Sequence, residues 1–247
     1  MPSRTNLNWT GVAELGSYPV MHRLILAEPA YSSWSMRIGL LVEAFDLPLQ
    51  IDWAILYSVP ILIEQIAHPP ARTVPFLLCA DGTEVRESLA IAEELADRFP
   101  DATLWPRDPL LRGLARSLAS EMHAGFLALR TQCPMVLRVA YRDVAVDDAL
   151  AADLARLEEI WADALIRSGG PWLAGGYSIA DAFFAPVAAR IAGYGLPVSD
   201  RAAKYVAQHL SDPAFRRWRA LGMTMGADRH DTVYRNQYPR VHWPSPD

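Results

Sequence analysis

Cysteine is scarce in this sequence. Cys79 and Cys133 are the only two among 247 residues, and they lie far apart without CxxC spacing. Two such cysteines exclude the disulfide framework of small secreted domains and do not have the spacing of a zinc site. The six histidines show no H-x-x-x-H pair. We therefore predict no metal site.

Long apolar runs and basic clusters are missing too. No segment approaches the roughly 18 apolar residues that cross a bilayer, and residues 1–22 have no apolar stretch typical of a signal peptide. We therefore expect no membrane partner and a cytoplasmic location. The formal net charge is −5, and no run of Lys or Arg occurs that could neutralise phosphates. Nucleic acid is therefore excluded as the main partner.

What is present is the composition of a globular protein, with 51% hydrophobic and 21% charged residues. Such a chain is long enough to bury a core in one or two domains. Residues 1–20 are polar and aperiodic, and they predict an irregular extension. Residues 23–28 and 49–57 predict two strands, with a helix between them that stops before Pro48.

The clearest local pattern in the first half is a hairpin. An apolar strand from residue 74 reaches Asp81-Gly82, a favoured turn pair, and a short return strand follows. An amphipathic helix then begins at Ser88 and ends before Pro100. A short helix over 59–67 and an irregular loop, "HPPART", precede the hairpin.

From about residue 110 the pattern is helical only. Ser178-x-x-Asp181 is a capping-box pattern, and it opens one of the helices. The stretch 101–109, with two prolines, is the natural linker. The sequence thus predicts an α/β module followed by an all-helical one, whose helices cover residues 110–130, 147–168, 178–195 and 212–221.

Residues 30–41, "AYSSWSMRIGLL", place serines where a helix begins. The free N–H groups and positive dipole end of a helix N-terminus favour an anion. Serine is also a common N-cap with no other role. The residues alone leave both interpretations open.

Two further segments can also be interpreted either as purely structural or as ligand-binding. Thr73-Val74-Pro75 enters a strand with an edge proline, or with a cis proline that exposes the Val74 backbone to an extended peptide ligand. Glu87-Ser88 opens a helix, where Ser88 caps it or binds a carboxylate while Glu87 binds an ammonium.

Together these segments resemble the glutathione transferase superfamily. "YSSWSMRIGLL" is similar to the serine-type active-site segment, "ARTVPFL" to the cis-proline loop, and "ESLAIAEELADRFP" to the Glu-Ser glutathione-binding helix. "ASEMHAGFLALR" and "SIADAFFAPV" resemble segments of the helical domain. The resemblance covers roughly residues 22–222. Its serine-rich pattern is similar to that of the zeta class (maleylacetoacetate isomerase) and of bacterial relatives with Ser-Ser-Trp-Ser.

The resemblance implies a thioredoxin-like N-terminal domain over 21–101 and an all-helical domain over 108–225, with an extension at 1–20 and a tail at 226–247. It implies a homodimer that binds glutathione and a small hydrophobic electrophile. Ser32 and Ser33 would contact the sulfur. The other implied glutathione contacts are Trp34, Arg72, Val74, Pro75, Glu87 and Ser88, and the implied electrophile contacts are Met122, His123 and Phe126.

The residue types suit thiol activation. An unperturbed thiol has a pKa of about 8.5, and only the thiolate is a competent nucleophile. A hydroxyl hydrogen bond to a charged acceptor is worth roughly 1.5–3 kcal/mol, which lowers a thiol pKa by about one to two units. The helix dipole adds to this effect. A serine therefore acts here as a donor, and no base is required.

Two positions depart from the family pattern. "HPPART" lacks the usual glycine, so that either His68 or Arg72 could reach the glycyl carboxylate, and Trp34 stands where zeta enzymes carry a cysteine. The expected function is a glutathione transferase. The alternatives are a glutathione-dependent isomerase, an ether-cleaving or dehalogenating lyase, or a non-catalytic glutathione-binding module.

The tail adds an open question of its own. Tyr234, Tyr238 and Trp243 could cover the cleft or the partner subunit, or the tail could be a loosely ordered surface strap.

Overall fold

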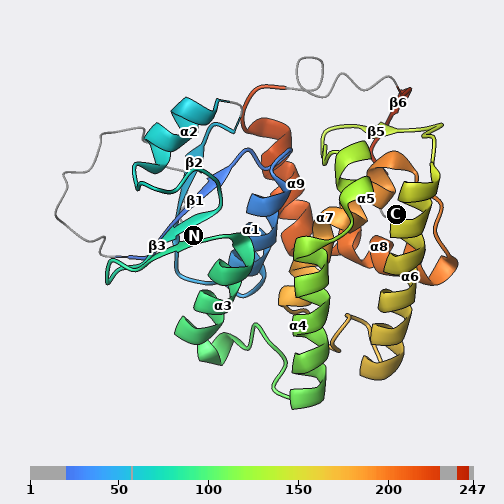
Figure 1. Ribbon diagram of the computed structural model, residues 1–247, viewed down its shortest axis with the longest axis horizontal. Coiled ribbons are helices and arrows are strands. Elements are labelled where there is room, and N and C mark those ends of the chain that lie inside the picture. The colour runs from blue at the N-terminus through green and yellow to red at the C-terminus, as the bar shows by residue number, and fades with distance from the viewer. Residues whose placement is uncertain (1–20, 57, 229–237, 245–247) are drawn as a thin grey trace.

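The computed structural model describes residues 21–56, 58–228 and 238–244. The predicted extension over 1–20 and Tyr234 of the tail lie outside these residues. Figure 1 shows a sheet with its helices in one half of the molecule and a helical bundle in the other, with α1 between them. The first half contains β1 (Arg23–Ala27), α1 (Ser33–Ala44), β2 (Gln50–Ala54), α2 (Val59–Ile66), β3 (Phe76–Leu78), β4 (Glu84–Arg86) and α3 (Ser88–Arg98).

The sheet has the order β2-β1-β3-β4. β1 and β2 are parallel, and β3 is antiparallel to both β1 and β4. Successive residues of a strand face opposite sides of a sheet. Leu24 and Leu26 accordingly join the core shared with α1 and α3, whereas Ile25 and Ala27 pack with α2. This parallel pair with a crossover helix and a following hairpin confirms the predicted thioredoxin-like unit.

Apart from two short strands, the described residues of the second half form helices and loops, as predicted. The prediction of one helix over 110–130 was wrong, because the chain breaks at Gly125 and at Phe126, whose φ is +58°. The sequence interpretation also missed α8 and the strand pair β5–β6. The elements are η1 (Pro100–Ala102), α4 (Pro109–Ala124), α5 (Leu127–Gln132), β5 (Ala140–Tyr141), α6 (Asp148–Ser168), α7 (Ile179–Tyr194), α8 (Asp200–Ser211), α9 (Pro213–Thr224) and β6 (Arg240–Val241). The domain boundaries given above remain a prediction.

The buried helix α7 is the centre of the bundle, and its predicted capping box is confirmed. The backbone N–H and the hydroxyl of Ser178 both donate to the Asp181 carboxylate, at 3.0 and 3.1 Å. The same carboxylate accepts from the Leu173 N–H at 3.0 Å and from the Tyr205 hydroxyl at 2.9 Å. A fully buried carboxylate with four donors thus ties the start of α7 to α8.

Helix α9 holds the start of α1 in place. A Cβ atom on Gly39 would lie 1.9 Å from the Trp218 ring, so glycine allows α1 and α9 to approach closely. The Trp218 indole N–H donates to the carbonyl of Pro29 at 3.0 Å. The turn between β1 and α1, which carries the serine cluster, is therefore anchored to the helical half.

The described part of the tail packs on the helical half. β6 pairs with β5, and the side chains of Tyr238 and Trp243 contact the main core. Trp243 lies over Gly193 of α7, and the guanidinium of Arg219 lies 5.0 Å from its ring. None of the described helices is both long and apolar enough to cross a bilayer.

His209 of α8 is fully buried between Trp172 and Tyr205, and neither ring nitrogen has a hydrogen-bond partner in the described residues. Burial lowers the pKa of this imidazole to about 3. Because the unfolded chain takes up a proton near pH 6.5 and the folded chain does not, stability is full above about pH 6.5 and is lost as the pH falls towards 3. The expected slope is up to about 1.4 kcal/mol per pH unit.

The variant His209→Phe isolates this effect, because it keeps an aromatic ring and removes the titration. Burial raises the pKa of Asp181 to about 6. This carboxyl therefore lowers the free energy of unfolding as the pH rises from about 4 to 6. The effect is the same in the wild type and in His209→Phe, so it cancels when the two are compared. Urea unfolding at several pH values should show the wild type losing about 3 kcal/mol relative to His209→Phe between pH 7 and pH 4. Parallel stability profiles would contradict the assignment.

Candidate functional site

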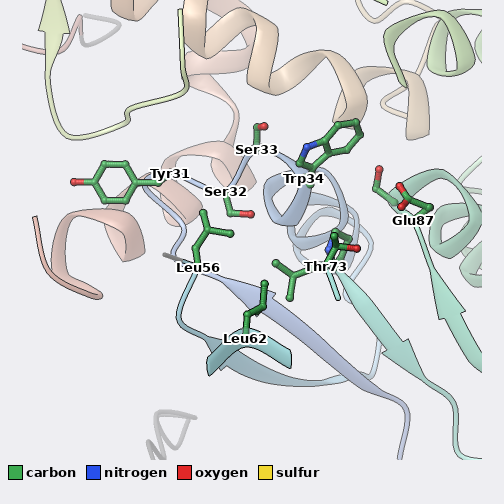
Figure 2. Close-up of a pocket in the computed structure, with 11 residues that line it drawn as sticks. Tyr31, Ser32, Ser33, Trp34, Leu56, Leu62, Thr73 and Glu87 are labelled. Atoms are coloured by element: carbon green, nitrogen blue, oxygen red, sulfur yellow. The ribbon is translucent and has the colours of Figure 1, made fainter. Parts of the chain in front are cut away.

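A cleft of about 360 Å³ lies where the starts of α1 and α3 meet the loop before β3. Figure 2 shows the side chains that line it. The segments around the cleft are those that the sequence singled out, together with a leucine that follows β2 and a leucine of α2. The lining residues are Tyr31, Ser32, Ser33, Trp34, Leu56, Leu62, Thr73, Val74, Pro75, Glu87 and Ser88.

Ser32 is the N-cap of α1 and is only 4% exposed. Its hydroxyl oxygen accepts from the Ser35 N–H at 3.3 Å and lies 2.8 Å from the Ser35 hydroxyl. Ser35 Oγ in turn accepts from the Ala27 N–H at 3.0 Å. The three residues form a hydrogen-bonded chain that runs from the end of β1 to the cleft. Ser35, which is buried within α1, therefore supports a residue that lines the cleft.

Ser33 has a different environment. Figure 2 shows its hydroxyl directed away from the Ser32 hydroxyl, which points into the cleft. The Ser33 oxygen accepts a hydrogen bond from Arg190 Nη2 of α7 at 3.4 Å. The two serines thus face different parts of the site, Ser32 towards the loop before β3 and Ser33 towards the helical half.

The loop before β3 contains the predicted cis bond between Val74 and Pro75. Val74 lies outside the β3 ladder, which begins at Phe76. Arg72 is exposed and does not line the cleft. His68 contacts Glu84 of β4, with Nδ1 2.9 Å from the carboxylate. The structure therefore brings Val74 and Pro75 to the cleft and leaves Arg72 and His68 outside it.

Helix α3 starts with two unusual features. Glu87, the N-cap, has a φ of +71°, a region where a non-glycine residue costs about 1–3 kcal/mol and which is common at ligand sites. Ser88 is 1% exposed, and its hydroxyl has no hydrogen-bond partner in the described residues. The first-turn N–H groups of a helix also lack intrahelical partners. This end of α3 therefore offers unused donors to the cleft, beside an exposed carboxylate.

Trp34 forms the wall of the cleft towards the helical half. The guanidinium of Arg37 lies 4.2 Å from the ring centre, and that of Arg130 lies 4.8 Å away. His123 of α4 meets the same ring edge-to-face at 5.2 Å, and its Nε2 lies 4.0 Å from a Glu87 carboxylate oxygen. Of the three predicted electrophile contacts, the structure places only His123 beside the site. Met122 and Phe126 are buried in the core.

The charge around Trp34 is positive. Arg37 is 2% exposed, and its Nε and Nη1 have no hydrogen-bond partner in the described residues. Burial, followed by the neighbouring Arg190 and Arg130, lowers the pKa of Arg37 to about 9, so it remains charged at neutral pH. Burial and Arg37 also lower the pKa of His123, which Glu87 only partly offsets. The sequence interpretation missed these arginines, although Arg37 stands out as a charge among the apolar residues of α1.

A thioredoxin-like unit whose helix starts frame a cleft, joined to a helical bundle, is the architecture of glutathione transferases. Residues 31–98 match the family model described as "Glutathione S-transferase, N-terminal domain". This part of the chain is therefore similar to the N-terminal domain of glutathione S-transferases.

Known proteins are similar to this chain in sequence over part of its length and in fold over most of it. A curated relative from Caenorhabditis elegans, a "Probable maleylacetoacetate isomerase", is 31% identical over 97 residues, which cover 39% of this chain and 44% of that protein. A glutathione transferase homologue from Burkholderia, solved with bound glutathione, is 24% identical with a TM-score of 0.62, covering 83% of this chain and 99% of its own. "Glutathione S-transferase unclassified 2" from Bombyx mori is 21% identical with a TM-score of 0.67, covering 87% and 98%. The two structures share the fold with this chain.

Proposed function

We propose that the cleft binds glutathione and activates it as a thiolate for attack on an electrophile. The observation that carries the proposal is the start of α3, where the buried Ser88 hydroxyl lacks a partner and Glu87 is held at positive φ. Unpaired N–H and hydroxyl donors suit the α-carboxylate of the γ-glutamyl group, and a nearby carboxylate suits its ammonium. The match to the N-terminal domain family and the glutathione bound in the Burkholderia homologue support the same ligand.

The γ-glutamyl end at α3 would leave the cysteinyl part beside Val74 and the sulfur near the start of α1. Ser32 is the donor that we assign to the sulfur, because its hydroxyl points into the cleft. A hydroxyl can donate one hydrogen bond while accepting others. In the structure the Ser32 hydroxyl donates to Ser35 Oγ, and each of the two oxygens also accepts one backbone N–H. When the thiolate binds, the Ser32 proton would turn to the sulfur and the Ser35 hydroxyl would donate to Ser32 in its place.

The thiolate then forms a bond from sulfur to carbon, and the electrophile releases its leaving group with the bonding electron pair. No side chain needs to take a proton during this step, because the thiol has ionised on binding. The similarity to the worm protein favours isomerisation as a second candidate, in which the sulfur adds and later leaves. Both reactions begin with the same thiolate. A homodimer and a cytoplasmic location remain part of the prediction.

Titration calorimetry tests the proposed ligand. Glutathione should release heat on binding to the wild type. Ser88→Ala and Glu87→Gln should each raise the Kd by about tenfold, because each removes one hydrogen bond or ion pair to a charged group of the ligand. Glu159→Gln, on the surface of α6, is a matched control that should bind as the wild type does. If the wild type shows no binding, the proposal fails.

Ser35 provides a separate prediction about activation. Replacing Ser35 with Ala removes the hydroxyl that orients Ser32, and should raise the pKa of the bound thiol by roughly half to one unit with glutathione affinity nearly unchanged. The thiolate absorbs in the ultraviolet, so a pH titration of the complex reports the pKa directly. An unchanged pKa would mean that Ser32 is oriented without Ser35.

A further inference from the structure

One end of the cleft is apolar. Leu56, which follows β2, and Leu62 of α2 line the cleft there, and this part is called the leucine end below. In the view of Figure 2, Thr73 lies between Leu62 and Glu87, so the leucine end is well separated from the start of α3. The segment that carries both leucines, residues 53–63, contains no acidic or basic residue.

The backbone donors near the leucine end already have acceptors. The Leu56 N–H donates to Glu28 Oε2 at 2.8 Å, and the Ile55 N–H donates to the Gln65 side chain at 2.7 Å. Helix α2 has Pro60 in its first turn, and proline has no N–H to offer. A carboxylate at the leucine end would therefore lose its hydration and gain few hydrogen bonds in return.

A buried carboxylate lies behind the same wall. Glu28, which directly follows β1, is 6% exposed, and its hydrogen bond to the Leu56 N–H places it next to the leucine end. Two negative charges repel each other, and the repulsion is stronger where the dielectric is low. The leucine end is therefore a poor site for the carboxylate of a ligand.

The cations of the loop before β3 do not compensate for this charge. Arg72 is exposed and does not line the cleft. His68 faces Glu84, with Nδ1 2.9 Å from the carboxylate, and its ring stacks on Phe76 at 5.2 Å between ring centres. Among the described residues that line the cleft, none is Lys, Arg or His. The leucine end thus has apolar surface to offer a ligand and no positive charge.

Glutathione has a carboxylate at each end, one on the γ-glutamyl group and one on the glycine. With the γ-glutamyl group at α3 and the cysteinyl part beside Val74, the glycyl end extends towards the leucine end. We infer that the cleft recognises this end of the thiol by apolar contact, so that it favours γ-glutamyl-cysteinyl thiols whose C-terminal carboxylate is masked or replaced by an apolar group. The inference rests on the proposed function and deepens it, because it names the class of thiol that the site favours. Glutathione itself still binds through its other two parts.

The monoethyl ester of glutathione, esterified at the glycine, tests this inference beside glutathione itself. The ester removes one charge, adds a short apolar group and leaves the γ-glutamyl and cysteinyl parts unchanged. Titration calorimetry gives the ratio of the Kd of glutathione to the Kd of the ester. For the wild type we expect a ratio of about three or more, because the added carbons are buried and the repulsion from Glu28 is removed. A site that pairs the carboxylate with a cation would give a ratio of about one tenth.

A matched pair of variants locates the apolar contact. Leu56→Ala shortens a partly buried side chain that lines the cleft, and should lower the Kd ratio by about twofold or more. Ile61→Ala shortens a side chain of α2 that is 41% exposed and does not line the cleft, and should leave the ratio unchanged. A ratio that falls equally in both variants would contradict the inference.

Arg72→Gln tests the competing assignment, in which this arginine turns into the cleft and binds the glycyl carboxylate. We expect the Kd ratio of this variant to equal that of the wild type. A higher ratio in Arg72→Gln would show that Arg72 binds the carboxylate, and the inference would be wrong.

Failure of this inference is distinct from failure of the proposed function. If the wild type binds glutathione but binds the ester no tighter, the inference is wrong and the proposed function stands. If the wild type binds neither compound, the proposed function fails first.

Discussion

Ser32→Ala should raise the pKa of the bound glutathione thiol by about one to two units, to near its value in solution. The hydroxyl is the donor that we place at the sulfur, and a hydrogen bond to a charged acceptor is worth roughly 1.5–3 kcal/mol. The rate at neutral pH should fall by about tenfold to a hundredfold, since the thiolate fraction falls with the pKa. Ultraviolet titration of the thiolate and kcat/KM against pH measure the two effects.

Ser33→Ala is the matched control for this experiment, because it removes a neighbouring hydroxyl that faces Arg190. It should leave the thiol pKa within a few tenths of a unit of the wild-type value. The opposite result, a raised pKa in Ser33→Ala and an unchanged pKa in Ser32→Ala, would assign the sulfur to Ser33.

Asp181→Ala should have the largest effect on folding, about 3–5 kcal/mol of stability. Four donors from three residues point at this buried carboxylate, and its removal leaves them unpaired in the core. Each buried unsatisfied group costs about 1–3 kcal/mol, with partial relief from rearrangement. Urea unfolding at pH 7 should show a lower midpoint with an unchanged slope.

Asp147→Ala provides a comparison at another helix start. Asp147 caps α6 by accepting from the Leu150 N–H at 2.8 Å, in an exposed position where water can replace it. Its loss should cost about 1 kcal/mol. Equal losses of stability in the two variants would show that the Asp181 network is no stronger than an ordinary cap.

Local patterns were sufficient to predict most of the fold. The strands around α1, the hairpin at Asp81-Gly82 and the capping box at Ser178 each depend on a few neighbouring residues, so they can be inferred without tertiary information. The break at Gly125 could not be inferred, because helical periodicity continues across it. The interruption between α4 and α5 occurs at Phe126, which is buried and has a positive φ.

The candidate site was predictable in part for the same reason. Glu87 and Ser88 are adjacent in the sequence, and residues at a helix start can be expected to bind charged groups of a ligand. The arginines near Trp34 and Ser33 come instead from α1, α5 and α7, which only tertiary packing brings together. On α4, Met122 faces the core, whereas His123, the next residue, lies about a quarter-turn away and faces Trp34. Phe126 lies beyond the end of α4 and is buried.

A crystal structure of the protein with glutathione tests the central claim most directly. The account predicts the sulfur within hydrogen-bond distance of Ser32 Oγ, the cysteinyl backbone beside Val74 and the γ-glutamyl carboxylate at Ser88. A glutathione molecule bound outside the cleft would contradict it. So would a sulfur at Ser33 that leaves the pair of Ser32 and Ser35 undisturbed.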